Sequence, residues 1–266
     1  MKTHLAALKD SKYCPLWHDQ PDIRPEVLSA LSQDESCELL IVGGGFTGLW
    51  AALQAKECCP DADVILIEKT FVGDGSSGRN GGFINSSLAH GETNTEHHFP
   101  GEADKLYELG QQNITELLAT FEKYNIDARY ESVGETEVAT NQHSVDELRK
   151  AYEEAKAEGD DVVFFNKEEM QAQVNSPTYL AGLWYKGDQN GIVDPARVCW
   201  GLKRVLLELG VRIFENTPLD DSLPLGSDKM RSTCLGHVIT SDKVLMATNA
   251  YKNPLKAVSR TTIPVW

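Results

Sequence analysis

The stretch Glu38-Leu39-Leu40-Ile41-Val42-Gly43-Gly44-Gly45-Phe46-Thr47-Gly48 decides the fold of this chain. Its first five residues form a short apolar run, which is typical of a strand buried in a parallel sheet. Gly43, Gly45 and Gly48 then follow with the GxGxxG spacing of a dinucleotide-binding turn. The first glycine permits the tight turn, the second leaves room for a pyrophosphate, and the third lets the next helix pack on the strand.

The residues after the glycines complete a βαβ unit. A helix is predicted from about Thr47 to Glu57, and a second buried strand over residues 64–67. Phe46 and Thr47 open the helix, where N–H groups and a partial positive charge favour phosphates. Glu68, followed by Lys69, ends the second strand, where an acid accepts hydrogen bonds from a ribose. This context favours a dinucleotide site over a purely structural glycine turn, but FAD and NAD both use such a unit.

Composition places the chain among globular proteins and excludes several classes of partner. The chain has 266 residues, of which 41% are hydrophobic and 24% charged, enough to bury a core. Its formal net charge is −15, so nucleic acid and anionic membranes would repel it. With no signal peptide and no membrane span visible, we expect a cytoplasmic protein. None of the six cysteines forms a CxxC pair, so we expect reduced thiols.

Apolar spacing predicts further elements along the chain. Asp194 and Pro195 are a typical helix start, as N-cap and first helical residue, and Gly210 ends that helix. Gly134 is expected to turn a β-hairpin over residues 129–140. The other predicted helices cover residues 102–123 and 145–158 and open near 166, and the other strands cover 162–165, 211–214 and 244–247.

One loop separates FAD from NAD. The run Gly73-Asp74-Gly75-Ser76-Ser77-Gly78-Arg79-Asn80-Gly81-Gly82-Phe83 closely resembles the SGRNGG element of the D-amino-acid-oxidase-like (DAO) superfamily of FAD-dependent oxidoreductases, and most of all its gamma-glutamylputrescine oxidoreductase-like members. In that family the element runs beneath the flavin ring and pyrophosphate. The resemblance therefore assigns a cofactor role to Ser77, Gly78, Arg79, Asn80, Gly81 and Gly82.

Further segments resemble the same family in the same order. Residues 13–22 resemble its aromatic N-terminal arm, and residues 190–195 its entry to a helix. Residues 215–219 resemble its E-x-T-P-V strand end, which implies that Leu219 touches the adenine by its backbone. Residues 245–251 resemble the strand under the cofactor, which implies that Ala247 and Thr248 lie there.

The sequence departs from the family pattern at two places. Cys59 stands where relatives often have a small glycine that closes the first helix. The chain also ends soon after residues 260–265, which resemble the family's R…IPV strand, whereas the family continues with much of its substrate domain. We therefore expect a fragment, with an apolar end at residues 262–266 that exposes strand edges and promotes self-association.

The resemblance implies a Rossmann-like α/β FAD-binding domain with part of an α+β substrate domain. The predicted regions are an N-terminal arm (1–36), the FAD-binding βαβ unit and flavin loop (37–90), part of a substrate or cap region (91–190), and a return to the FAD-binding domain (191–266). Family resemblance implies hydride transfer from the carbon beside an amine nitrogen to FAD, then imine hydrolysis and reoxidation by dioxygen or another acceptor. The substrate is then a small amine or amino acid.

The sequence alone leaves several alternatives open for the function of the chain and for the roles of single residues. The chain is an amine oxidase or dehydrogenase whose remainder is absent, a truncated FAD-binding product without activity, or an NAD-dependent dehydrogenase, which the flavin loop disfavours. Arg79 either anchors an acidic substrate or forms part of the flavin surroundings or a loop salt bridge. His97 and His98 lie in a polar segment that we expect to be a solvated loop rather than a metal site. No catalytic residue is nominated.

Overall fold

The computed structural model describes residues 9, 11, 14–88, 92–187 and 191–250. The chain divides into two compact units. Unit 1 comprises Met1–Gly81, Ile126–Ala128 and Asp194–Trp266, and unit 2 comprises Gly82–Asn125 and Arg129–Val193. The expectations for Tyr13, Asn190, Tyr251 and the strand at 260–265 lie outside the described residues.

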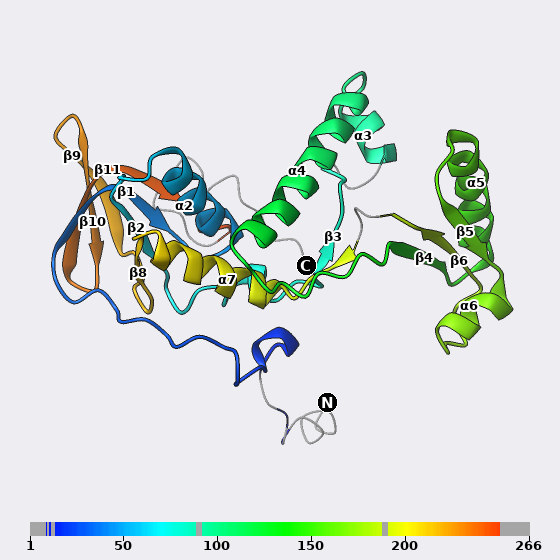
Figure 1. Ribbon diagram of the computed structural model, residues 1–266, viewed down its shortest axis with the longest axis horizontal. Coiled ribbons are helices and arrows are strands. Elements are labelled where there is room, and N and C mark those ends of the chain that lie inside the picture. The colour runs from blue at the N-terminus through cyan, green and yellow to red at the C-terminus, as the bar shows by residue number, and fades with distance from the viewer. Residues whose placement is uncertain (1–8, 10, 12–13, 89–91, 188–190, 251–266) are drawn as a thin grey trace. The chain divides into compact units, whose positions relative to one another are not determined.

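A six-stranded sheet forms the centre of unit 1 (Figure 1). The strand order is β8-β2-β1-β11-β10-β9, with parallel pairing from β8 to β11 and antiparallel pairing from β11 to β9. The α/β fold class predicted from the sequence is confirmed. The strands are β1 (Glu35–Val42), β2 (Val64–Ile67), β8 (Arg212–Phe214), β9 (Asp221–Leu225), β10 (Lys229–Cys234) and β11 (His237–Met246).

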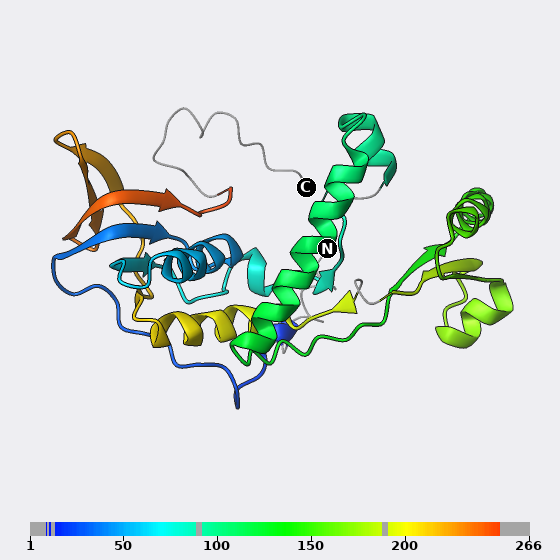
Figure 2. The same cartoon turned by 45° about the horizontal axis from the view of Figure 1, so that its top comes forward.

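The parallel strands explain the apolar runs in the sequence. All four residues of β2 are buried, as are Leu40, Ile41 and Val42 of β1, because neighbours cover both faces of a central parallel strand. Helices α2 (Phe46–Cys58) and α7 (Pro195–Glu208) pack against each other in this unit (Figures 1 and 2). As predicted, Asp194 caps α7, accepting hydrogen bonds from the amides of Ala196 and Arg197.

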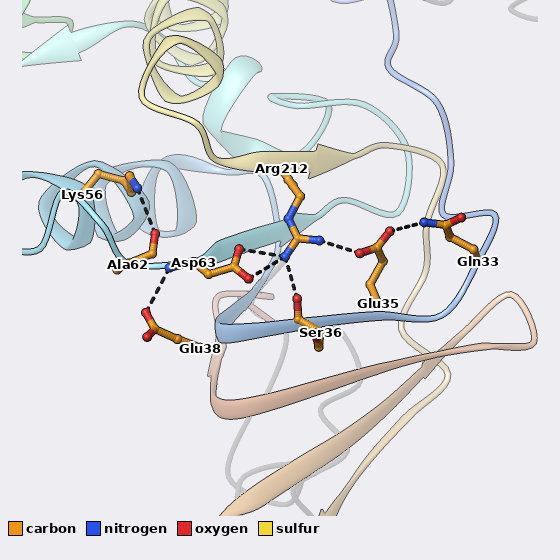
Figure 3. A network of polar contacts seen from close by, with 8 residues as sticks. All are labelled: Gln33, Glu35, Ser36, Glu38, Lys56, Ala62, Asp63 and Arg212. Atoms are coloured by element: carbon orange, nitrogen blue, oxygen red, sulfur yellow. Dashed lines mark hydrogen bonds and ion pairs between the residues drawn. The ribbon is translucent and has the colours of Figure 1, made fainter.

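A charged network joins the amino-terminal ends of three parallel strands (Figure 3). The Arg212 guanidinium of β8 contacts Glu35 of β1 at 2.5 Å and both carboxylate oxygens of Asp63, before β2, at 2.7 and 2.8 Å. Burial lowers the pKa of Arg212, but the hydrogen bond that Arg212 donates to Asp63 and the nearby carboxylates outweigh it and raise the pKa overall. This network lies opposite the strand ends that carry the glycine turn.

The described residues of the N-terminal arm before β1 are largely irregular, as predicted, and they belong to unit 1. Its short 3-10 helix η1 (Leu16–His18) contacts α7. A second 3-10 helix, η2 (Ser76–Gly78), lies in the glycine-rich loop and also contacts α7. Strand β1 then begins at Glu35, three residues earlier than the apolar run alone indicates.

Unit 2 contains a three-stranded sheet, a two-stranded ladder and four helices among its described residues. The sheet order is β4-β6-β5, and β3 pairs with β7. Asn166 and Glu169 form a reciprocal capping box at the start of α6, where the sequence predicted a helix. The elements are β3 (Phe83–Ile84), α3 (Glu92–His98), α4 (Ala103–Lys123), β4 (Glu135–Ala139), α5 (Gln142–Glu158), β5 (Val162–Phe165), α6 (Lys167–Gln173), β6 (Ala181–Tyr185) and β7 (Gly191–Ile192).

Two local predictions are wrong. No hairpin turns at Gly134, because β4 pairs with the distant β6, and Glu131 bridges to Ile192 instead. The sequence pattern contained the turn signal but not the long-range partner. His97 and His98 are exposed, as expected, but they end helix α3 rather than lying in a loop.

Candidate functional site

The glycine turn after β1 shows why two of its residues lack side chains. Gly43 has a φ of +116°, and a Cβ there would lie 2.4 Å from the carbonyl oxygen of Ala247. A Cβ on Gly48 would lie 2.0 Å from the carbonyl oxygen of Gly43, so only glycine lets α2 approach the turn this closely. The roles predicted for both residues in the turn and in helix packing are confirmed.

The middle glycine faces the flavin loop, which we define as residues 73–82. A Cβ on Gly45 would lie 2.8 Å from the Ser77 hydroxyl, which itself accepts a hydrogen bond from the Phe46 amide at 2.9 Å. Ser77 therefore satisfies one of the amides at the start of α2. A larger residue at 45 would displace Ser77, whether or not a phosphate also lies there.

Helix α2 presents its amino-terminal end at this turn. The first intrahelical bond runs from the Leu49 amide to the Gly45 carbonyl at 3.0 Å. The amides of Thr47 and Gly48 precede that bond, so they stand in the part of a helix that has no partner within the helix. Thr47 is exposed. This end carries the partial positive charge that stabilises an anion.

Glu68 lies beside the turn, at the end of β2. One carboxylate oxygen accepts the Gly44 amide at 2.7 Å, and the other accepts the Thr70 amide and hydroxyl at 3.0 and 3.2 Å. A carboxylate has about four acceptor positions, so these three bonds orient it and leave capacity for a further donor. The neighbouring Lys69 is exposed.

Two segments from later in the chain lie beside the carboxyl ends of β1 and β2. The Ala247 amide, just after β11, donates to the Val42 carbonyl at 2.9 Å. The next residue, Thr248, has a buried hydroxyl with no hydrogen-bond partner among the described residues. The Thr217 amide donates to the Glu68 carbonyl at 2.8 Å, and Leu219 follows two residues later, half-buried against the core. The topology thus brings together the motifs at 43–48, 68, 217–219 and 247–248.

The flavin loop is held in shape by its own hydrogen bonds. Arg79 forms an ion pair with Asp74 at 2.6 Å, which favours the loop salt bridge among the alternatives for this residue. The Asn80 side chain donates to the carbonyls of Ser76 and Ser77 at 3.2 and 2.9 Å. Gly81 is exposed, and Gly82, with a φ of +81°, begins unit 2.

The sequence did not single out two buried polar groups close to this loop. His18 is 4% exposed and lies 3.2 Å from the Gly73 carbonyl oxygen. Lys203 of α7 forms a 2.8 Å ion pair with Glu215, with side chains 4% and 1% exposed. Glu215 also accepts the Leu28 and Val72 amides. The sequence did contain one signal for this pair. Lys203 follows Cys199 by four residues and so lies on the apolar side of the predicted helix, where a lysine requires a partner of opposite charge.

We expect His18 to make stability depend on pH. Burial lowers the pKa of His18 from 6.5, with Arg79 and Arg24 adding to this and the Gly73 carbonyl and Asp74 opposing it. The folded state therefore binds fewer protons than the unfolded state, so this stabilisation is present above about pH 6.5 and falls as the pH drops below it. Urea unfolding between about pH 7.5 and 5 measures the slope.

The matched control for this slope is a histidine on the surface. His18→Gln should flatten the fall in unfolding free energy, whereas His143→Gln, at a side chain that is 82% exposed, should leave the slope unchanged. Equal slopes in both variants and the parent chain would contradict a role for His18.

Other kinds of site find no support in the described part of the chain. No group of three or more His, Cys, Asp or Glu side chains there is placed to hold a metal ion. None of the six cysteines forms a disulfide, and Cys58 and Cys59 are exposed at the end of α2. Burial raises the pKa of the Cys37 thiol to about 11, which makes it a poor nucleophile. Among the described helices, none has the length and apolar character to cross a membrane.

Comparison with known proteins identifies the family. Residues 38–265 match the family described as "DAO: FAD dependent oxidoreductase". The chain belongs to this family. The match covers the glycine turn, Glu68, the flavin loop and the β11 end, so the resemblance read from these motifs is confirmed, and FAD is the cofactor of the family.

Individual relatives agree with the DAO assignment. A probable oxidoreductase OrdL of Haemophilus influenzae is 30% identical over 243 residues, which are 88% of this chain and 55% of that protein. A gamma-glutamylputrescine oxidoreductase of Escherichia coli is 26% identical, over 83% of this chain and 51% of that protein. The chain spans about half the length of these relatives. The crystal structure of glycine oxidase from Geobacillus kaustophilus has the same fold, with a TM-score of 0.68, 19% identity, and coverage of 84% of this chain and 58% of that one.

Proposed function

We propose that this chain binds FAD and contributes to oxidation of the C–N bond of a small amine or amino acid. The observation that carries the proposal is the meeting of the glycine turn, the α2 amino terminus and Glu68 at one edge of the sheet. Ligands of open α/β sheets bind outside the carboxyl ends of the strands, which is this edge. When bound, FAD supplies the hydride acceptor for the reaction.

The residues present fit FAD. The Phe46–Gly48 end of α2 suits the pyrophosphate, and Glu68 retains acceptor capacity for the adenosine ribose. The buried Thr248 hydroxyl is a polar group still lacking a partner among the described residues, as expected of a group that a ligand satisfies. We propose further that the backbone of Leu219 borders the adenine, and that Lys69, Ala247 and the loop from Ser77 to Gly82 complete the cofactor surface.

The charge distribution favours a cationic substrate. Unit 2, which contains most of the proposed substrate region, carries 20 acidic side chains against 8 Lys and Arg, a net charge of −12. Unit 1 has 20 acidic against 17 basic residues, a net charge of −3. A negative field raises the local concentration of cations, so it attracts amines more than carboxylates.

The experiment that tests the function has two stages. Purified chain is titrated with FAD while quenching of flavin fluorescence and the visible spectrum are followed, and NADH serves as the competing ligand. The FAD-loaded protein is then mixed with mono- and diamines and with neutral amino acids, with peroxide formation and dye reduction as readouts. We expect FAD binding, and faster turnover of amines than of amino acids at low salt.

The outcomes separate the alternatives. FAD binding without turnover of any amine or amino acid, with either acceptor, would favour the catalytically inactive FAD-binding chain. Tight NADH binding without FAD uptake would refute the proposal altogether.

A further inference from the structure

Two adjacent residues of the N-terminal arm reach both ends of the flavin loop. The indole Nε1–H of Trp17 donates to the Asn80 carbonyl at 2.8 Å, near the end of the loop. The His18 Nε2 lies 3.2 Å from the Gly73 carbonyl oxygen, at its beginning. Because a carbonyl oxygen only accepts, Nε2 must carry the proton, so both contacts are N–H donors from η1 to the loop backbone.

Packing supports the same arrangement. A Cβ on Gly78 would lie 2.7 Å from His18 Nε2, so the middle of the loop also rests against the arm. The His18 ring makes an edge contact with Phe71, which precedes the loop, with ring centroids 5.4 Å apart. The Arg24 guanidinium lies 4.2 Å from the centre of the same Phe71 ring. The arm therefore contacts the loop at its start, middle and end.

We infer that η1 is a positioning element for the cofactor, acting by fixing the backbone of the flavin loop. Ser77 lies between the two loop positions that η1 contacts, Gly73 and Asn80. Its hydroxyl accepts a hydrogen bond from the Phe46 amide at the start of α2. Holding the loop at Gly73 and Asn80 thus holds Ser77 against the helix end proposed for the pyrophosphate. Trp17 and His18 act through the loop backbone that they contact, so they are positioning residues. The inference rests on the proposed function only for its effect on FAD.

The test removes the N–H donor of Trp17 and keeps an aromatic ring at that position. Trp17→Phe deletes the Nε1–H that bonds to Asn80, and Trp184→Phe is the matched control, because Trp184 donates to the Val133 carbonyl at 3.0 Å in unit 2. The first readout is hydrogen exchange of the cofactor-free chain. The amides of Gly78, Arg79 and Asn80 are bonded to carbonyls inside the loop and report its order.

We expect Trp17→Phe to speed exchange of these three amides about fivefold, the effect of one lost hydrogen bond, while Trp184→Phe leaves them unchanged. The second readout is the dissociation constant for FAD, which should rise about fivefold in Trp17→Phe with the urea midpoint kept near that of Trp184→Phe.

Each result has a separate meaning. Unchanged hydrogen exchange of the loop amides in Trp17→Phe, or equally faster exchange in both variants, would overturn the inference that η1 holds the loop. Faster hydrogen exchange of the loop amides with an unchanged FAD dissociation constant would show that η1 holds the loop without positioning the cofactor, which also overturns the inference. If the parent chain binds no FAD, the proposed function fails, and the exchange experiment still decides whether η1 orders the loop.

Discussion

Lys203→Met should lower the free energy of unfolding by about 3–5 kcal/mol. The substitution keeps the length of the side chain but removes the ammonium that pairs with Glu215 at 2.8 Å, where both side chains are almost fully buried. The Glu215 carboxylate would keep the amides of Leu28 and Val72 but lose its charged partner. An uncompensated buried charge is costly because water cannot replace the lost interaction. Urea unfolding measures the difference.

The next residue of the same helix provides the control. Arg204 pairs with Glu208 at 2.9 Å, with side chains 45% and 60% exposed. Arg204→Met should therefore change the unfolding free energy by less than about 1 kcal/mol, since exposed ion pairs contribute little. A difference between the two variants below about 1 kcal/mol would show that Glu215 finds enough compensation without Lys203.

Gly43→Ala should destabilise unit 1 by about 2–4 kcal/mol and abolish measurable FAD uptake. The new Cβ would meet the Ala247 carbonyl oxygen at 2.4 Å, and the φ of +116° is unfavourable for alanine. The contacting atom is backbone, so relief requires β1 and the residues after β11 to separate. Thermal or urea unfolding and FAD titration measure the two effects.

Gly75→Ala is the matched control within the flavin loop. Gly75 has a φ of −74°, and a Cβ there meets nothing within 4 Å. We expect a change in stability within about 0.5 kcal/mol and retained FAD binding. Similar losses in both variants would mean that the loop and turn tolerate no side chain at all, and that the close approach to Ala247 is not the cause.

Local patterns predicted those parts of the fold whose causes are local. Strands β2 and β5 and the cap of α7 depend on apolar runs and on Asp194-Pro195, and they lie where the sequence placed them. Helix α5 begins at Gln142 rather than near 145, because Asn141 caps it by accepting the Ser144 amide. Asn141 was visible in the sequence, but a single capping residue is a weaker signal for where a helix begins than a periodic pattern of apolar residues.

Features that depend on distant partners could not be predicted. No strand was predicted at β9, β10 or β6. Strand β9 is mostly exposed and β10 is mostly polar, and β6 lies between β4 and β5, with which it pairs on both edges. In the candidate site, the glycines and Glu68 carry recognisable spacing, whereas His18 belongs to a polar arm. Its burial depends on contacts 55 residues away, at Gly73. A single sequence contains no periodic signal for such a contact.

The pairing of β1 with β11 also governs how the chain reaches its fold during synthesis. Glu35 pairs with Ile239 and Val42 with Met246, so the first strand waits for about 200 further residues before one of its neighbours exists. At about 5–20 residues per second, a ribosome leaves that strand edge open for roughly 10–40 s. Unit 2 is synthesised almost entirely within this interval, so it can fold before β11 pairs with β1 and completes the sheet of unit 1. Nascent chains stalled between residues 193 and 237 should therefore bind chaperones through the apolar edge of β1.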